Sequence, residues 1–255
     1  MPLWGKGLVI RMNKIERKVN DGATPFLSRL LVCITMPLVV LVFIVVAVDY
    51  CATAETWLRT EYEKLDINDY TGMSTDDQVK AFMCMAKYMK GETSYDEMRR
   101  LEVTVNGEKV SMFNNSELSH MKDVRKLYVG VTVFKILVIV FFAATYILRK
   151  RAAPNYIPKV YLISFAVILG IFLLLGAWAL IDFDSFWQVF HIVFLDLEGS
   201  TFDPAYSRMI RICPAELFLD MVIRIFVFGF IIPALIAILF GGEMLYRKVK
   251  NRKSA

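Results

Sequence analysis

Four long runs of apolar residues dominate the hydropathy pattern of the chain. The runs Leu30–Val48 and Tyr161–Ile181 carry no charge, while Val129–Leu148 and Met221–Phe240 each contain one basic residue in their first half. Each run is close to the ~20 residues with which a helix crosses a ~30 Å hydrocarbon layer, and a helix satisfies its own backbone hydrogen bonds there. The pattern predicts four transmembrane helices, at residues 26–48, 129–148, 161–181 and 221–242.

The segment between the first two runs, residues 49–128, carries the local signals of a small folded cap. Ser74 is followed by two acidic residues and then by apolar residues at helical spacing up to Gly91, which predicts a helix. The alternating run Leu101–Val105 precedes Asn106-Gly107, the strongest two-residue signal for a β-hairpin. So small an element cannot bury much apolar surface alone, and we expect it to dock on the ends of the membrane helices.

Two shorter segments flank the remaining runs. A helix beginning at Asn115 or Ser116 is expected to carry His120 and to lead directly into the second run. After the third run, Phe186–Leu195 is too short to cross a membrane and too apolar for a solvated loop. We expect this stretch to lie in the membrane interface, anchored by its aromatic residues.

Charge decides the orientation. A net charge of +5 with 56% hydrophobic and 22% charged residues excludes an ordinary soluble globule, a disordered chain and a nucleic-acid binder. Residues 1–29, 149–159 and 243–255 together hold 15 Lys and Arg against three acidic residues, a net of +12, which leaves −7 for the rest. The positive-inside rule therefore places both termini in the cytoplasm, and residues 49–128 and 182–220 outside.

The expected fold is an all-α polytopic membrane protein: four transmembrane helices with a small α+β extracellular cap between helices 1 and 2. Its cytoplasmic parts are the basic N-terminus 1–25, the loop 149–160 and the tail 243–255. The first run resembles a secretory signal, because Ala52-Thr53-Ala54 looks like a cleavage site. Its apolar core exceeds the ~7 to 15 residues of a signal peptide, so an uncleaved anchor is expected.

The chain contains two histidines, and both fall at the same predicted membrane interface. Glu117 and Asp123 lie three residues either side of His120, so that a carboxylate could orient its ring. Trp187 and Phe194 flank His191, an apolar setting that favours the neutral imidazole. The two rings could form an acid and base pair; the alternative is that each only makes an interfacial hydrogen bond.

Other chemistry has little support in the sequence. Metal binding is a rival explanation for histidines near acids, but the chain has no His-x-x-x-His or His-Glu-x-x-His pattern. It also lacks a Gly-rich phosphate loop, a Gly-x-Ser-x-Gly elbow and a Cys-x-x-Cys pair, so no metal and no cofactor are expected. Of the four cysteines, Cys33 lies within the first run, and Cys51, Cys84 and Cys213 lie outside the membrane runs. Three outside cysteines allow at most one disulfide. The simpler interpretation is that the cysteines are small buried hydrophobic residues.

Two blocks of residues carry a resemblance to a known family. Leu118–Leu127, with the pattern His-Met-x-Asp-Val, lies just ahead of the second run; Phe190–Phe194 and Pro214–Phe218 lie ahead of the fourth. These blocks, with the four-span topology, resemble the bacterial membrane proteins of the lipoprotein intramolecular transacylase family, Lit. Two stretches depart from the family pattern and leave the substrate range open: the basic start Met1–Asp21, and Asp196–Ser200.

The resemblance implies an acyltransferase that acts within one lipoprotein. Such an enzyme moves the sn-2 acyl chain of a diacylglyceryl lipoprotein to the α-amine of its N-terminal cysteine, giving the lyso form. The two catalytic histidines of the family correspond to His120 and His191. The expected partners are the lipoprotein and membrane lipid, with no nucleic acid and no metal.

The finer roles follow as expectations. We favour His120, oriented by Asp123 with Glu117 nearby, as the base toward the amine and His191 as the acid toward the glyceryl oxygen; the reverse stays open. Arg211 is a candidate donor to the oxyanion. Aromatic residues are expected to confine the substrate and exclude water: Trp187, Phe190, Phe194, Tyr206 and Trp178.

Two other functions compete with this one. The first is a non-enzymatic membrane partner or chaperone with structural histidines. A transporter or channel is a weaker choice, because the middles of the runs lack the acids and histidines of a conduction path.

Overall fold

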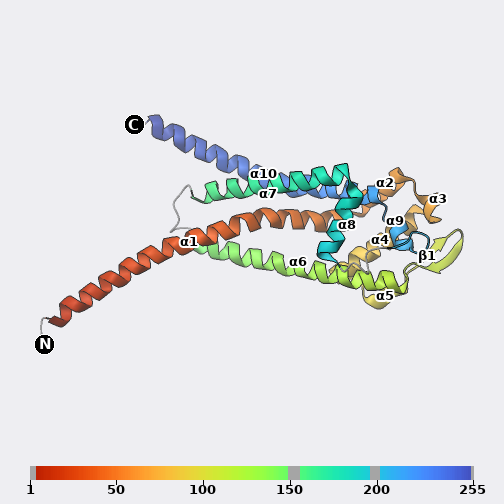
Figure 1. Ribbon diagram of the computed structural model, residues 1–255, viewed down its shortest axis with the longest axis horizontal. Helices are drawn as coiled ribbons and strands as arrows, with labels where there is room; N and C mark the ends of the chain where they lie inside the picture. The colour runs from red at the N-terminus through yellow and green to blue at the C-terminus, as the bar shows by residue number, and fades with distance from the viewer. Residues whose placement is uncertain (1–3, 149–155, 196–201, 254–255) are drawn as a thin grey trace. The chain divides into compact units, whose positions relative to one another are not determined.

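The computed structural model describes residues 4–148, 156–195 and 202–253 (Figure 1). Its chain divides into two compact units. Unit 1 comprises residues 1–42, 136–168 and 232–255, and unit 2 comprises residues 43–135 and 169–231. The residues 149–155 of the predicted cytoplasmic loop, and the stretch Asp196–Ser200, lie outside the described residues.

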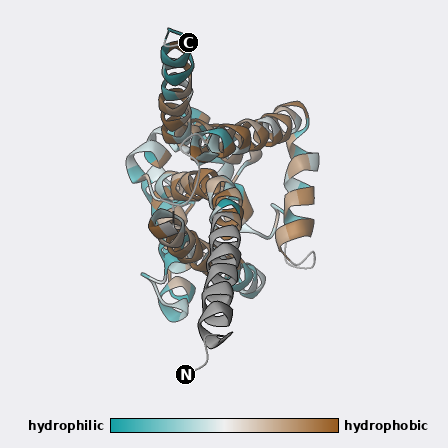
Figure 2. Cartoon of the chain, turned by 90° about the vertical axis from the view of Figure 1, so that its left-hand side faces the viewer, coloured by the Kyte–Doolittle hydropathy of each residue, from teal (hydrophilic) through white to brown (hydrophobic). Residues whose placement is uncertain are grey.

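Among the described residues, four helices are long and apolar enough to cross a membrane: α1 (Trp4–Ala52), α6 (Asn115–Leu148), α7 (Tyr156–Ile181) and α10 (Ala215–Lys253). The four predicted spans are therefore confirmed, and three of the helices run well beyond their apolar segments. Large side chains on these helices are open, with Leu174 exposed by 75% and Ile139 by 66%. Such an apolar surface suits lipid rather than water. The C-terminal end of α10, by contrast, is hydrophilic (Figure 2).

Within unit 1, polar side chains join the membrane helices. The hydroxyls of Thr35 on α1 and Thr145 on α6 are 2.6 Å apart. The Tyr161 hydroxyl of α7 donates to the carbonyl oxygen of Pro233 on α10, at 2.9 Å. Hydrogen bonds of this kind hold helices together where no hydrophobic force acts between them.

The cap, here residues 53–114 between α1 and α6, belongs to unit 2. Its helices are α2 (Glu55–Leu65), α3 (Asn68–Thr71), α4 (Thr75–Lys90) and α5 (Tyr95–Arg99). As predicted, the Ser74 hydroxyl caps α4 by accepting from the Asp77 amide at 3.2 Å, and Gly91 ends it at φ +82°. The short helices α2, α3 and α5 were not foreseen.

The predicted hairpin is confirmed. Strands β1 (Glu102–Val105) and β2 (Glu108–Ser111) pair antiparallel, with Val105 opposite Glu108. Asn106 at φ +51° and Gly107 at φ +86° form the two-residue turn. Both residues tolerate the left-handed backbone that such a turn requires.

The core of the cap is shared with the neighbouring ends of α1 and α10. Leu58, Met98 and Met112 of the cap pack in one buried cluster with Cys51 of α1 and Leu217 of α10. The expected docking of the cap on the membrane helices is thus confirmed, and the shared core supplies apolar area that the cap alone would lack.

The basic residues inside the second and fourth spans have partners in unit 2. Lys135 Nζ of α6 lies 2.5 Å from an oxygen of Asp49 on α1, and both side chains are mostly buried. The Arg224 guanidinium of α10 lies over the ring of Trp57, 4.9 Å from its centroid. Pairing and cation–π contact allow a charge to remain at these positions.

Candidate active site

Helix α6 carries the first histidine, and its start is set by a reciprocal cap. The Asn114 side-chain oxygen accepts from the Glu117 amide at 2.9 Å, and the Glu117 carboxylate accepts from the Asn114 amide at 2.7 Å. This capping box begins the helix at Asn115, as expected. It places His120 in the second turn, where its side chain is only 9% exposed.

Helix α8 (Phe183–Phe194) carries the second histidine. The Asp182 carboxylate caps it by accepting from the Ser185 amide at 3.0 Å. Twelve residues span only about 18 Å, too little to cross a membrane. In Figure 1 the helix runs across its neighbours rather than along them, as the interfacial interpretation of this stretch requires.

The structure brings the two histidines together, although 71 residues separate them in the sequence. Their ring centroids are 6.1 Å apart and their planes differ by 20°. The expected proximity is confirmed. At this separation both rings can face one small reacting group, which an acid and base acting on the same carbonyl carbon must do.

The position of the His191 ring identifies its free nitrogen. His191 Nδ1 lies 2.8 Å from the Trp187 carbonyl oxygen, one turn earlier in α8. Because a carbonyl oxygen only accepts, Nδ1 carries a proton and Nε2 is the nitrogen available for proton transfer.

Neither carboxylate near His120 orients its ring by a hydrogen bond within the described part of the chain. Glu117 is 1% exposed and directs its second oxygen to α9 (Arg208–Ile212), accepting from the Ser207 hydroxyl at 2.5 Å and from the Met209 amide at 2.9 Å. Asp123 instead pairs with Lys126 at 2.7 Å. The sequence spacing suggested a direct contact to His120, whereas tertiary and local partners occupy both carboxylates.

An aromatic stack supports His191. The Trp187 ring lies 4.7 Å from the His191 ring and is nearly parallel to Phe218 of α10 at 4.3 Å. Phe190 lies 5.4 Å from Trp187 and 5.7 Å from His191. Phe194 continues the row at 5.0 Å from Phe190. Three of the five predicted aromatic residues therefore gather around this histidine or next to it.

The other two predicted aromatics lie elsewhere. Trp178 packs edge-to-face on Phe186, with centroids 5.6 Å apart, and Tyr206 is 81% exposed on a turn. The sequence interpretation missed two rings instead: Phe218, and Phe202, whose ring stands nearly perpendicular to His120 with centroids 5.4 Å apart. Phe218 lies inside the second family block and could have been found there; Phe202 carries no periodic signal.

Arg211, the expected oxyanion donor, can be compared with two other arginines of unit 2. Arg211 lies on α9, half-buried, and its Nε has no hydrogen-bond partner among the described residues. Arg208 donates to the Ser111 carbonyl oxygen at 3.1 Å, and Arg125 lies 4.8 Å from the centre of the Tyr88 ring. The Nε of Arg208 also has no partner among the described residues, so Arg211 and Arg208 both retain donor capacity.

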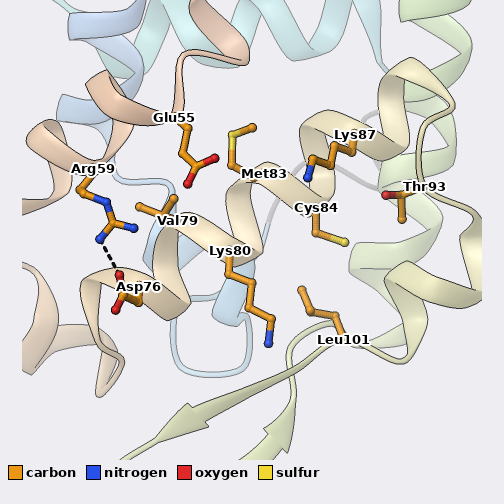
Figure 3. A pocket seen from close by; sticks show the side chains of 10 residues that line it. All are labelled: Glu55, Arg59, Asp76, Val79, Lys80, Met83, Cys84, Lys87, Thr93 and Leu101. Atoms are coloured by element: carbon orange, nitrogen blue, oxygen red, sulfur yellow. Dashed lines mark hydrogen bonds and ion pairs between the residues drawn. The ribbon is translucent and has the colours of Figure 1, made fainter.

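Two open cavities of the cap contain neither histidine. The first, of about 370 Å³, lies beside α4 and is crossed by the ion pair of Arg59 and Asp76 at 2.5 Å (Figure 3). Burial raises the pKa of Cys84 on its wall. A second cavity of about 440 Å³ lies against the hairpin.

The cysteines and acids add no further centre. All four cysteines are free, and burial, with the nearby Glu117, raises the pKa of Cys213 to about 12. Such a thiol is a poor nucleophile. The described part of the chain holds no group of three or more His, Cys, Asp and Glu that could bind a metal ion.

The fold and this site define a multi-pass membrane protein with a two-histidine centre next to a small cap. The family model of the lipoprotein intramolecular transacylase Lit matches residues 31–218. The chain therefore belongs to the Lit family, whose members are acyltransferases acting on lipoproteins. This confirms the family, the fold class and the enzyme class expected from the sequence.

Solved structures show the same fold. The chain is similar to the membrane integral lipoprotein intramolecular transacylase Lit from Bacillus cereus, with 18% identity and a TM-score of 0.68 over 92% of this chain and 100% of that one. Two variants of that protein carry arginine or alanine in place of one histidine. They match with 17% and 16% identity and TM-scores of 0.61 and 0.64, over 95% and 94% of this chain and 100% of theirs. A comparison with curated proteins found no match.

Proposed function

We propose that this chain moves the sn-2 acyl chain of a diacylglyceryl lipoprotein from the glyceryl oxygen to the α-amine of the N-terminal cysteine, with His120 and His191 as the acid–base pair. The observation that carries the proposal is the juxtaposition of the two rings, 6.1 Å apart, in a chain that has no other histidine. Membership of the Lit family supports the same reaction class.

The reaction needs two proton transfers at one carbon. The α-ammonium must lose a proton before its nitrogen attacks the ester carbonyl; as the new C–N bond replaces the C–O bond, the glyceryl oxygen must gain a proton. A free imidazole has a pKa near neutrality, which suits both steps. Burial lowers the pKa of His120 to about 4, which keeps its ring in the neutral, proton-accepting form. Because amine and ester belong to one molecule, holding them together can lower the barrier by ~7 to 11 kcal/mol.

We assign His120 as the base toward the amine and His191 as the acid toward the glyceryl oxygen. The fixed Nδ1 proton of His191 leaves Nε2 as the nitrogen that exchanges a proton with the glyceryl oxygen. His120 is the more buried of the two rings and sits beside Phe202, a setting that favours the neutral, proton-accepting form.

The substrate's location follows from the aromatic residues and the charges. Trp187, Phe190 and Phe194 are expected to hold the acyl chain beside His191 and keep water away. The basic flanks of the spans support an orientation with both termini in the cytoplasm and the site on the extracellular face of the bacterial membrane. Arg211, with an unused Nε, is the proposed donor to the oxyanion.

Mass spectrometry of a model lipoprotein co-expressed with the protein tests the proposal. The expected product is a lyso lipoprotein whose cysteine nitrogen carries the acyl chain. His120→Ala and His191→Ala should lower its rate of formation by about 10² to 10⁴-fold, the usual contribution of an acid or base. Tyr70→Ala, at an exposed position of α3 in the cap, is a control that should retain the wild-type rate.

A diacylglyceryl cysteine with a free amine, recovered unchanged beside well-folded wild-type protein, would refute the enzyme and favour a non-enzymatic partner. Full activity in either folded histidine variant would remove that histidine from the mechanism while leaving the reaction in place. The melting temperature of each purified variant shows whether it is folded.

A further inference from the structure

Building on the proposed function, we infer that Phe202, anchored by Glu117, decides whether the acyl chain is transferred to the amine or lost to water. Phe202 is then a specificity-determining residue, and Glu117 a positioning residue that acts through it. Neither role follows from the acid–base pair alone.

The anchor is a buried carboxylate with three hydrogen bonds. Glu117 and Ser207 are 1% and 2% exposed, and the Ser207 hydroxyl donates to Glu117 at 2.5 Å. The Met209 amide donates to the same oxygen at 2.9 Å, while the Asn114 amide donates to the other at 2.7 Å. Hydrogen bonds to an ionised acceptor are the stronger kind, so α9 is firmly held to the first turn of α6.

A compact turn transmits this anchor to Phe202. The amides of Tyr206 and Ser207 both donate to the Asp203 carbonyl oxygen at 2.9 Å, and the Ala205 amide donates to the Asp203 side chain at 2.8 Å. Phe202 directly precedes this turn and packs against the buried cluster of unit 2. The position of Ser207 therefore sets that of Phe202.

Glu117, the anchor, and His120, the ring that Phe202 contacts, lie on one face of α6. Glu117 and His120 are three residues apart, the spacing that makes helical side chains neighbours. The segment Phe202–Ser207, which is held to Glu117 by Ser207, therefore also contacts His120 one helical turn further along α6. There the Phe202 ring stands at 79° to the His120 ring. The aromatic ring packs edge-to-face against the imidazole, the base that water would have to reach.

Water competes with the amine for the same carbonyl carbon. If the His120 ring takes a proton from water, the hydroxyl oxygen bonds to the carbonyl carbon, the ester C–O bond breaks and the glyceryl oxygen takes the proton. The products are a free fatty acid and a lyso lipoprotein with an unmodified amine. Excluding water from the base prevents this side reaction.

A synthetic diacylglyceryl lipopeptide and the full chain in proteoliposomes allow both products to be counted by mass spectrometry. The measured quantity is the ratio of free fatty acid to N-acylated lyso lipopeptide. In Phe202→Ala we expect this ratio to rise roughly tenfold, equivalent to about 1.4 kcal/mol of lost discrimination. Phe202→Leu, which restores bulk, should bring the ratio back toward the wild-type value, and Tyr70→Ala should leave it unchanged.

The anchor is tested with Ser207→Ala and Glu117→Ala. Both should raise the ratio, Glu117→Ala more, because it removes all three hydrogen bonds and Ser207→Ala spares the Met209 amide. Should Glu117→Ala not fold, Ser207→Ala decides. An unchanged ratio in folded Phe202→Ala, even at a lower overall rate, would overturn the inference and leave the proposed function standing. Absence of N-acyl product from wild type would overturn the proposed function itself.

Discussion

Replacing Glu117 should destabilise the protein much more than replacing Asp123, although both carboxylates lie three residues from His120. The structure gives them opposite surroundings. Glu117 is 1% exposed and accepts three hydrogen bonds, two of them from residues about 90 positions away in the sequence. The Asp123 side chain is 36% exposed and, within the described part of the chain, forms an ion pair with Lys126 three residues on.

The magnitudes follow from these contacts. Alanine at 117 removes the acceptor of the Met209 amide and the Ser207 hydroxyl, both buried, and breaks the cap of α6. Breaking a buried charged network typically costs about 3 to 5 kcal/mol. For a chain of this size, that corresponds to a melting temperature lower by about 10 °C. The exposed pair of Asp123 is worth about 0.2 to 1 kcal/mol, a shift of at most a few degrees.

Thermal unfolding of purified Glu117→Ala and Asp123→Ala in one detergent measures the difference. The melting temperature of Glu117→Gln should lie between those of wild type and Glu117→Ala. The glutamine amide keeps one acceptor oxygen but turns a donor toward the remaining partners. Equal melting temperatures for the two alanine variants would refute the reasoning, since they would mean that the carboxylate network does not stabilise the fold.

Two further predictions concern unit 2. Lys135→Met removes the partner of the partly buried Asp49 carboxylate and should cost about 1 to 3 kcal/mol. The double variant with Asp49→Asn should recover most of the lost melting temperature, and a double variant no more stable than the single one would contradict the pairing. Cys213 is 8% exposed with a pKa raised to about 12, so a maleimide at neutral pH should leave it unlabelled until the protein is unfolded. Rapid labelling of this thiol in the folded protein, read by mass spectrometry of its peptide, would argue against the buried position.

Two elements of the cap could be predicted because their signals lie in neighbouring residues. The hairpin turn at Asn106-Gly107 and the helix from Ser74 to Gly91 depend on neighbouring residues, and both were predicted. Two further local signals, both reciprocal caps at helix starts, are also present in the sequence. Ser94 and Glu97 form a reciprocal cap at the start of α5, and Asn114 with Glu117 forms another.

Of the candidate site, the sequence predicted mainly the pair of histidines. Scarcity singled out His120 and His191, and the interfacial position of both segments made their meeting plausible. Sequence spacing treats Glu117 and Asp123 as equivalent neighbours of His120 and cannot tell which one is buried. It also carried no sign that Phe202 reaches His120, because the contact depends on how α9 packs against α6.

The four membrane helices and the cap's hairpin and main helix can be predicted from the sequence alone, because hydropathy, capping and turn formation act over a few residues. The pair of candidate histidines can be predicted because the chain contains no others. The distance between the rings, the free nitrogen of His191 and the partners of Glu117 and Lys135 are visible only in the folded protein. Those features depend on which distant surfaces pack together. Packing is a property of the whole unit, so no local pattern along the chain can specify it.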